Sequence, residues 1–250
     1  MPLAIYRSPP IVAYGNFIFR HRDKLFPVAL AALFFAFPTR LFLGEDRVDL
    51  WGDIAAILLG LAGEALRVAT VGLDYIKRGG LNKQVYASRL VTGGIFAHSR
   101  NPLYVGNIIL ALALLLMLDN VAAFLVGAAV VIATYVAIVA AEERYLRAQF
   151  GADYDAYCGR VNRWIPDLRG LRATLRDSRF NWQRVLLKEF SSFYGWVSAA
   201  FAIELTSSWL AGDLGELDVV VYAALFVVAT LCFLAIRSAK AAGWLRLPPA

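Results

Sequence analysis

Two clusters of polar residues flank a pair of apolar segments and could together bind a charged ligand. The first, in the run SRNPLYVGN, consists of Arg100 and the Asn101–Pro102 pair at the start of an apolar segment. The second is the acidic pair Glu142 and Glu143, which follows the next apolar segment. A helix N-terminus and an arginine favour a carboxylate or phosphate, whereas carboxylates favour an ammonium group. The two clusters therefore predict a site for a ligand that carries both charges, such as an amino acid moiety.

The apolar segments between these clusters, Leu103–Leu118 and Val121–Ala141, are expected to form a helical hairpin. Asp119 and Asn120 separate them, and both residue types are favoured in turns. The Asn-Pro pair in front of the first segment is typical of a helix start, with asparagine as the N-cap and proline at the first helical position. Because a hairpin returns its two ends to the same side of a membrane, it would bring the two polar clusters together.

The composition is that of an integral membrane protein. Of 250 residues, 60% are hydrophobic and 18% are charged, whereas a soluble domain has about 45–50% and about 25%. A helix needs about 20 apolar residues to cross a bilayer, and six segments approach that length. The sequence therefore predicts an all-α, polytopic membrane protein with about six transmembrane helices. The segments are Leu25–Leu43, Leu50–Leu73, Leu103–Leu118, Val121–Ala141, Phe193–Leu210 and Leu217–Ile236.

The distribution of Lys and Arg predicts the orientation in the membrane. These residues gather at the N-terminus, in the long connections 74–102 and 142–192, and after Ile236, while the short connections are mostly acidic. Positively charged loops stay on the cytoplasmic side. Both termini and both long connections are therefore expected in the cytoplasm. We expect the protein in the inner membrane of a bacterium, with the hairpin site facing the cytoplasm.

The whole chain, residues 1–250, is expected to form a single membrane domain. Its parts are a core at about 50–166, an interfacial segment at 167–192 and a C-terminal two-helix hairpin at 193–236. The interfacial segment mixes arginines with Leu, Phe and Trp, a pattern typical of an amphipathic helix on an anionic membrane surface. An ordinary basic loop that obeys the topology rule is the alternative.

Few residues in this chain could bind a metal or cross-link the fold. Two cysteines and two histidines provide neither a disulfide framework nor a metal cage. We predict no metal ligand and no nucleic acid partner, since the topology accounts for the net charge of +6. No G-x-G-x-x-G run follows a strand-like segment, which argues against a Rossmann nucleotide-binding domain.

Two longer runs resemble a known superfamily. They are LVTGGIFAHSRNPLYVG at 90–106 and AEERYLRAQFGADYDAYCGRVNRWIP at 141–166. Both resemble the isoprenylcysteine carboxyl methyltransferase and phospholipid methyltransferase superfamily, over about residues 50–166. Its members share a small-residue turn, an aromatic, R-H-P-x-Y-x-G, a membrane hairpin, an E-E pair and F-G-x-x-Y-x-x-Y. Asn101 stands where the family usually has histidine, and an asparagine neither carries charge nor shuttles a proton.

The resemblance implies an integral membrane methyltransferase that uses S-adenosyl-L-methionine and acts on a membrane lipid or lipophilic acceptor. It implies catalytic roles for Glu143 and Arg163, and contact with the substrate for Tyr154, Arg163 and Trp164. The residues that it places around the cofactor are Leu90, Val91, Phe96, His98, Arg100, Asn101, Pro102, Tyr104, Glu142 and Glu143.

Glu64 and Arg67 form a separate pair of candidates inside the second apolar segment. Three residues apart on one helix face, they are able to pair with each other. An ionisable residue within a span indicates a functional site by default, because burying it without a partner is costly. We therefore predict that this pair lines the substrate site, and a purely structural ion pair is the alternative.

A different class of protein is also compatible with these features. A non-catalytic membrane carrier or assembly factor could bind a zwitterion at the same hairpin. A reductase on a related helical scaffold is disfavoured, because the chain has no second nucleotide-binding stretch. The pattern does not distinguish nitrogen, oxygen or sulfur as the methyl acceptor.

Overall fold

The computed structural model describes residues 8–37, 46–74, 86–212 and 214–245. Within these residues the chain is all-helical and contains no strand, as predicted. The elements are α1 (Pro9–Ala36), α2 (Asp46–Leu73), η3 (Gly94–Ala97), α3 (Pro102–Leu116), α4 (Val121–Arg160), α5 (Leu171–Asp177), α6 (Trp182–Ala211) and α7 (Glu216–Ala241). The six predicted segments correspond to α1, α2, α3, α4, α6 and α7. Residues 38–43 of the first predicted segment lie outside the described residues.

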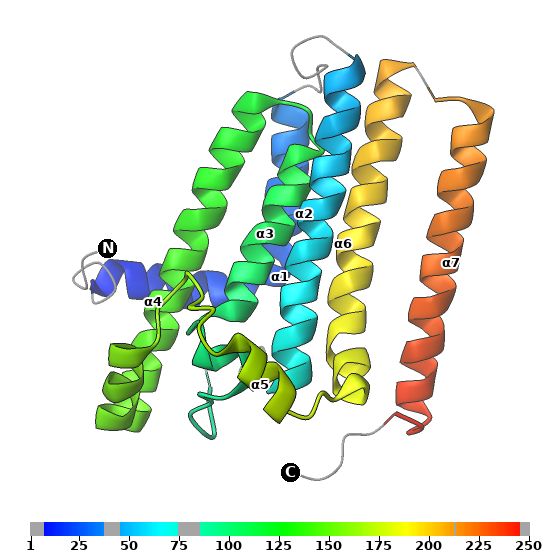
Figure 1. The fold of residues 1–250 in the computed structure, drawn as a ribbon. Coiled ribbons are helices and arrows are strands. Elements are labelled where there is room, and N and C mark those ends of the chain that lie inside the picture. The colour runs from blue at the N-terminus through cyan, green and yellow to red at the C-terminus, as the bar shows by residue number, and fades with distance from the viewer. Residues whose placement is uncertain (1–7, 38–45, 75–85, 213, 246–250) are drawn as a thin grey trace.

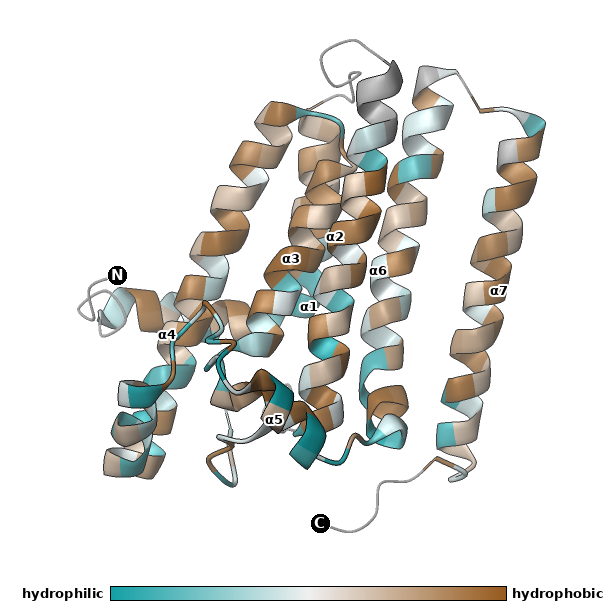
Figure 2. Ribbon diagram, viewed as in Figure 1, coloured by the Kyte–Doolittle hydropathy of each residue, from teal (hydrophilic) through white to brown (hydrophobic). Residues whose placement is uncertain are grey.

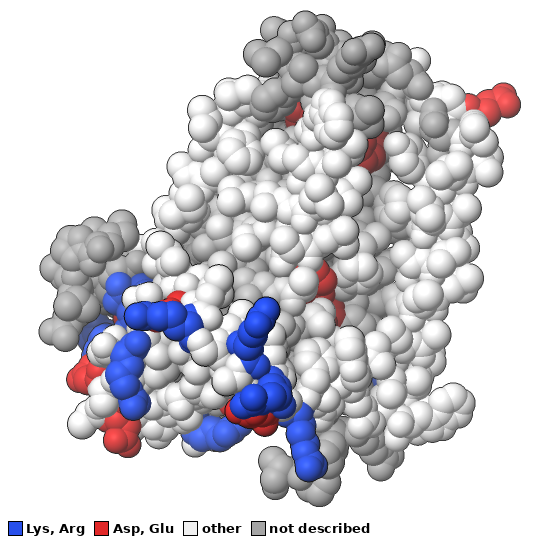
Figure 3. All heavy atoms as spheres, in the orientation of Figure 1, with Lys and Arg blue, Asp and Glu red and all other residues white. Residues whose placement is uncertain are grey.

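The long helices form a bundle with α7 at one side (Figure 1). α2 packs on α3 and α6, α1 packs on α4, and α7 packs on α6. Apolar residues cover these helices over most of their length, and hydrophilic residues gather at α5 and the lower end of α4 (Figure 2). Lys and Arg gather over the same lower end (Figure 3). This separation of apolar and charged surface is that of a membrane protein.

Three helices in the described part of the chain are both long enough and apolar enough to cross a membrane. They are Trp51–Leu73, Val121–Arg160 and Val219–Ala241, and Pro102–Leu116 is a shorter apolar helix. The chain is therefore an integral membrane protein.

α1 begins earlier than its apolar segment predicts, at Pro9 rather than near Leu25. Figure 1 shows its first half lying crosswise to the bundle and its second half running along it. Pro27 lies inside this helix. A proline removes a backbone donor and crowds the preceding turn, so it accounts for the change of direction.

The predicted turn between α3 and α4 is present at Asp119 and Asn120. Asp119 has a positive φ of 49°, and the Asn120 carboxamide oxygen accepts a hydrogen bond from the Ala123 N–H at 3.0 Å. Asn101 differs from its expected role. It occupies the N-cap position of α3, but its side chain makes no capping hydrogen bond, because its amide is directed elsewhere, as described below.

α4 continues well past its apolar segment and folds back at Gly151. The backbone there has φ 49° and ψ −122°, a conformation that glycine adopts most readily because it lacks a Cβ atom. Figure 1 shows the lower end of α4 doubled back on itself. The returning part carries Tyr154 and Tyr157, and the Tyr157 hydroxyl donates to the Phe96 carbonyl oxygen at 2.7 Å. The fold-back therefore anchors the end of α4 to the stretch before α3.

The interfacial segment 167–192 does not form one amphipathic helix. Only Leu171–Asp177 is a separate helix, and α6 already begins at Trp182. Asn181 explains this early start, because its carboxamide oxygen accepts a hydrogen bond from the Arg184 N–H at 2.8 Å and so caps α6.

Candidate functional site

The stretch before α3 is joined by hydrogen bonds to the stretch after α4. The backbone N–H of Asp167 donates to the His98 carbonyl oxygen, and that of Arg100 donates to the Asn162 carbonyl oxygen, both at 2.9 Å. The Ser99 hydroxyl donates to the Trp164 carbonyl oxygen at 3.2 Å. These bonds connect residues more than sixty positions apart in the chain.

His98 is buried and belongs to this connection. One of its ring nitrogens, Nδ1, lies 2.6 Å from the Asp167 carbonyl oxygen, and Nε2 lies 2.9 Å from the Thr174 hydroxyl of α5. Hydrogen bonds from Arg169 lower the pKa of the Asp167 carboxyl to about 2, so this exposed group stays ionised at neutral pH. Because its two ring nitrogens contact Asp167 and Thr174, His98 positions the segment that follows α4.

Asn101 positions Arg163 through the same connection. Its side-chain amide donates to the Arg163 carbonyl oxygen at 3.1 Å, and Asn101 is only 8% exposed. Arg163 in turn makes two hydrogen bonds to Glu143, from Nε to Oε1 at 2.7 Å and from Nη2 to Oε2 at 2.9 Å. The amide at position 101 thus holds the backbone from which this two-pronged contact is made.

We expect Asn101→Ala to lower the free energy of unfolding in detergent by about 1 kcal/mol, because one buried hydrogen bond is lost. Asn101→His should restore most of this loss, since an imidazole N–H can also donate. Chemical denaturation followed by circular dichroism measures both changes. Asn16→Ala, at an exposed position of α1, is the matched control, and an equal loss in that variant would contradict the assignment.

Three guanidinium groups surround the single carboxylate of Glu143. In addition to Arg163, Arg100 Nη2 lies 3.5 Å from Oε1 and Arg147 Nη1 lies 3.8 Å from Oε2. The Glu143 side chain is only 2% exposed. Asp155 offsets part of the charge of Arg147, at 2.9 Å. Three guanidinium groups thus face Glu143, and a bound anion would interact favourably with them.

Arg100 has the clearest capacity to bind such an anion. Its side chain is 8% exposed, and its Nε atom is buried without a hydrogen-bond partner among the described residues. A buried N–H that forms no hydrogen bond is costly. A ligand carboxylate or phosphate oxygen would remove that cost by accepting a charge-assisted hydrogen bond.

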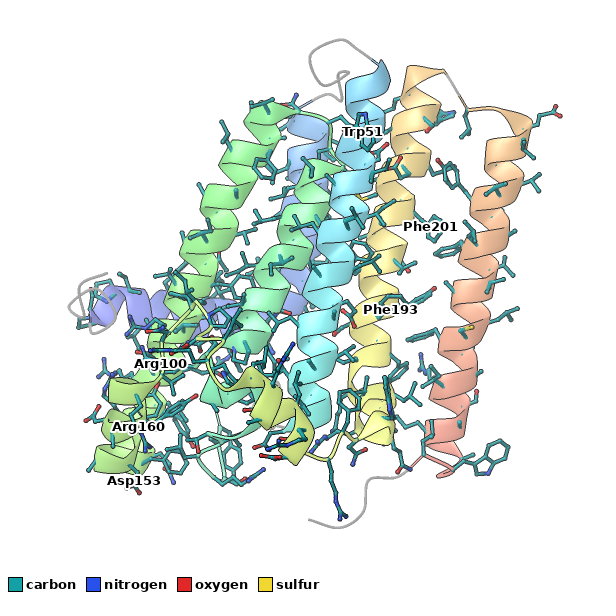
Figure 4. The ribbon with its side chains drawn as sticks, in the orientation of Figure 1. Trp51, Arg100, Asp153, Arg160, Phe193 and Phe201 are labelled. Atoms are coloured by element: carbon teal, nitrogen blue, oxygen red, sulfur yellow. The ribbon has the colours of Figure 1, made fainter. Side chains whose placement is uncertain are left out.

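A cavity of about 1050 Å³ reaches this arginine cluster, and residues of α1, α3, α4 and α6 line it. Figure 4 shows Arg100 near the lower ends of α3 and α4, far from Trp51 at the opposite end of the bundle. The predicted site residues that line the cavity are Arg67, Leu90, Val91, Phe96, Arg100, Asn101, Tyr104, Glu142, Glu143 and Tyr154. The fold thus gathers most of the predicted site around one space.

Five predicted site residues are not part of the cavity lining: Glu64, His98, Pro102, Arg163 and Trp164. Pro102 is fully buried at the start of α3, and Trp164 packs against the apolar side chains of α1, α3 and α4. Arg163 acts through Glu143, as described above. These five residues lie beside the cavity wall and do not line the cavity themselves.

Glu142 has a different environment from Glu143. Like Glu143 it lines the cavity, and its carboxylate lies near the Tyr104 hydroxyl. Because three guanidinium groups already compensate Glu143, the carboxylate best placed to meet a ligand ammonium group is Glu142. Both carboxylates line the cavity, and Glu143 is the one that faces the three guanidinium groups.

Glu64 and Arg67 pair as predicted, and a third residue joins them. Arg67 Nε lies 3.6 Å from the Glu64 carboxylate, and the Arg67 guanidinium also contacts Glu189 of α6 and Asn107 of α3. Both Glu64 and Glu189 are less than a tenth exposed. Arg67 alone of the three charged residues lines the cavity. The cluster joins α2, α3 and α6 beside the site.

Three residues that were not among the predicted site residues also contribute to this region: Arg147, Asn107 and Glu189. Arg147 follows Glu143 by one helical turn, so its spacing indicates the contact. Asn107 is one turn beyond Leu103 on the α3 face that lines the cavity. Glu189 could be recognised in the sequence only from its spacing to other residues. It precedes Trp196 and Ile203 at seven-residue steps and so shares their helix face.

The fold and the site define an integral membrane protein with a buried cationic cluster at one end of an intramembrane cavity. Residues 56–153 match the family described as phospholipid methyltransferase. The cobalt-zinc-cadmium resistance protein CzcN of Cupriavidus metallidurans is 32% identical over 162 residues, which cover 62% of this chain and 68% of that protein. The chain belongs to the phospholipid methyltransferase family. No solved structure matches it.

Proposed function

We propose that the protein is an S-adenosyl-L-methionine-dependent methyltransferase that acts on a membrane lipid or lipophilic acceptor. Family membership supports methyl transfer. The observation that carries the cofactor assignment is the cationic cluster around Glu143, at which Arg100 Nε lacks a hydrogen-bond partner among the described atoms. A methionine carboxylate is an anion of the size and shape that a guanidinium binds.

The residues around the cavity fit both charged ends of such a cofactor. Arg100 would hold the carboxylate of the cofactor. Arg163 and Arg147, which contact Glu143 beside it, would add positive charge to the same region. Glu142, rather than Glu143, would hold the ammonium group. The apolar residues Leu90, Val91 and Phe96 line the same cavity and would exclude water from the reacting atoms.

When bound, S-adenosyl-L-methionine supplies a methyl group activated by its sulfonium, and S-adenosylhomocysteine remains. Arg100 and Glu142 would hold the cofactor so that it could supply this methyl group to the acceptor heteroatom. The main task of the protein is to align the acceptor with the methyl, and such positioning supplies up to about 7–11 kcal/mol of barrier reduction. An amine acceptor must also lose a proton, which would pass to water, because Glu142 would hold the ammonium group of the cofactor.

The site is proposed to face the cytoplasm. Lys and Arg cover the end of the molecule at which the cationic cluster lies (Figure 3). By the positive-inside rule this end is cytoplasmic. We propose the same orientation in the bacterial inner membrane.

The relative CzcN has a name that refers to cobalt, zinc and cadmium resistance. The described residues include no group of three or more His, Cys, Asp and Glu placed to hold a metal ion, and we propose no metal ligand. A carrier that binds a zwitterion without methyl transfer is the rival function, and the following experiment separates the two.

Purified protein incubated with methyl-labelled S-adenosyl-L-methionine and a bacterial lipid extract is expected to place label in the lipid fraction. Arg100→Ala should weaken cofactor binding about 10- to 150-fold, because a hydrogen bond to a charged group contributes about 1.5–3 kcal/mol. Calorimetric titration measures this affinity. Arg237→Ala, at an exposed position on α7, is the matched control. Cofactor binding without label in any lipid would favour the carrier.

A further inference from the structure

The segment between α4 and α6 is held at both ends but makes few contacts in between. At its start, Asp167 and His98 are joined by two hydrogen bonds. At its end, the Asn181 N–H donates to the Gly72 carbonyl oxygen at 2.9 Å. None of residues 168–179 is buried. Among the described residues, their one hydrogen bond to another part of the bundle joins the Thr174 hydroxyl to His98.

α5, which lies in this segment, has little internal support of its own. It has seven residues, none of them buried, and it begins at Gly170 without a side-chain capping hydrogen bond. An isolated helix shorter than about 12–15 residues is marginal in water and depends on packing against a partner. The fold supplies that packing on one side only, so the exposed side of α5 indicates a partner outside the chain.

The chemistry of the exposed side is both apolar and basic. Its apolar side chains, each at least 48% exposed, are Ile165, Leu168, Leu175 and Trp182. Its exposed basic side chains are Arg169, Arg172, Arg176 and Arg179. Figure 3 shows Lys and Arg gathered over this part of the molecule. We call residues 165–182 the basic surface.

Two of these arginines have no acidic partner in the described part of the chain. Arg169 pairs with Asp167, and Arg176 pairs with Asp177 at 2.8 Å. Arg172 and Arg179 have no such ion pair. Arg172 lies three residues before Leu175 on α5, so the two side chains share a helix face. A free guanidinium beside an exposed leucine fits a surface that is anionic outside and apolar beneath.

The basic surface lies at the level of a membrane–water interface. α5 is at the end of the bundle where α2 ends and α6 begins (Figure 1). Trp182, the first residue of α6, is 67% exposed, and tryptophan is enriched at membrane interfaces. In the orientation proposed above, this end meets the cytoplasmic leaflet, which carries anionic lipids.

We infer that the basic surface is a docking surface for anionic lipid headgroups, and that docking stabilises the stretch before α3. Arg172 and Arg179 bind headgroup phosphates, and Leu175 enters the acyl boundary. Because Thr174 contacts His98 and Arg100 follows two residues later, a docked α5 also holds Arg100 at the cavity. This lipid is distinct from the methyl acceptor, and only its effect on cofactor affinity rests on the proposed function.

Amide hydrogen exchange tests the docking without any cofactor. The protein is placed in nanodiscs of phosphatidylcholine, or of phosphatidylcholine mixed with phosphatidylglycerol. One arginine near an anionic membrane strengthens binding about fivefold. Exchange in 167–179 should therefore be at least fivefold slower in the anionic nanodiscs. The double variant Arg172→Gln, Arg179→Gln should lose this difference. Arg20→Gln with Arg237→Gln, two exposed arginines of α1 and α7, is the matched control and should keep it.

Thr174→Val tests the connection to the site. It leaves every arginine of the basic surface in place but removes the hydroxyl that contacts His98. In wild type, phosphatidylglycerol should slow exchange in both 167–179 and 94–101. In Thr174→Val it should slow exchange in 167–179 alone. Calorimetric titration should likewise show tighter binding of S-adenosyl-L-methionine in anionic nanodiscs for wild type and no such gain for Thr174→Val.

Three outcomes would overturn the inference. The first is equal exchange of 167–179 in the two kinds of nanodisc, and the second is a difference that persists in the double variant. The third is equal protection by inorganic phosphate in phosphatidylcholine nanodiscs, which would indicate a site for a soluble anion. Wild-type protein that shows the exchange difference but does not bind S-adenosyl-L-methionine would contradict the proposed function and leave the docking surface established.

Discussion

Glu143→Gln is expected to reduce methyl transfer at least 100-fold. The carboxylate is 2% exposed and faces the guanidinium groups of Arg163, Arg100 and Arg147. A neutral amide would leave these cations close to one another with no anion between them. The displaced guanidinium groups would lose hydrogen bonds to the cofactor carboxylate that contribute about 1.5–3 kcal/mol each, and about 1.4 kcal/mol corresponds to a factor of ten.

Transfer of label from S-adenosyl-L-methionine to lipid measures this loss, and calorimetric titration measures cofactor affinity in the same preparation. Both should fall, because the cluster would no longer hold Arg100 and Arg163 in place. Glu216→Gln, at an exposed position at the start of α7, is the matched control. Transfer in Glu143→Gln within tenfold of wild type would refute the central role of this carboxylate.

Arg67→Met should cause a large loss of stability. It would leave the carboxylates of Glu64 and Glu189 buried beside each other without the guanidinium that both contact. The expected loss is again about 3–5 kcal/mol, which corresponds to a decrease in melting temperature of about 6–20 °C for a chain of this size. Differential scanning fluorimetry in detergent measures the change.

A triple variant, Glu64→Gln, Arg67→Met and Glu189→Gln, distinguishes lost charge compensation from lost packing. Replacing a whole buried ionic group by neutral residues of similar volume is often close to neutral, so this variant should regain most of the stability. Arg237→Met on the exposed side of α7 is the control for the arginine change. A triple variant as unstable as Arg67→Met would show that packing, not charge, accounts for the effect.

The sequence predicted the convergence at the site because hairpin geometry is local. Two apolar segments joined by Asp119 and Asn120 can only return their ends to one side of the membrane. The structure places Arg100 Nη2 3.5 Å from Glu143 Oε1, although the two residues are separated by the whole hairpin. Helix class, the approximate spans and the turn were likewise predictable from hydropathy and turn-forming residues.

The contacts of each polar side chain could not be predicted from hydropathy or from turn-forming residues. Asn101 has the residue type of an N-cap, yet its amide holds the Arg163 carbonyl, because the segment after α4 lies within reach. Glu142 and Glu143 are neighbours in sequence but point into different surroundings on the helix. Which one meets a ligand depends on where three arginines from separate segments come to lie.

The sequence by itself therefore determined an all-α membrane protein, its hairpin and the polar residues at one end of that hairpin. Periodicity and residue type carry this information because they act within a few turns of helix. Only the tertiary structure decided that residues of α6 line the cavity and that Glu189 joins Arg67. These are contacts between segments far apart in the chain, and their partners are set by packing, which no local pattern encodes.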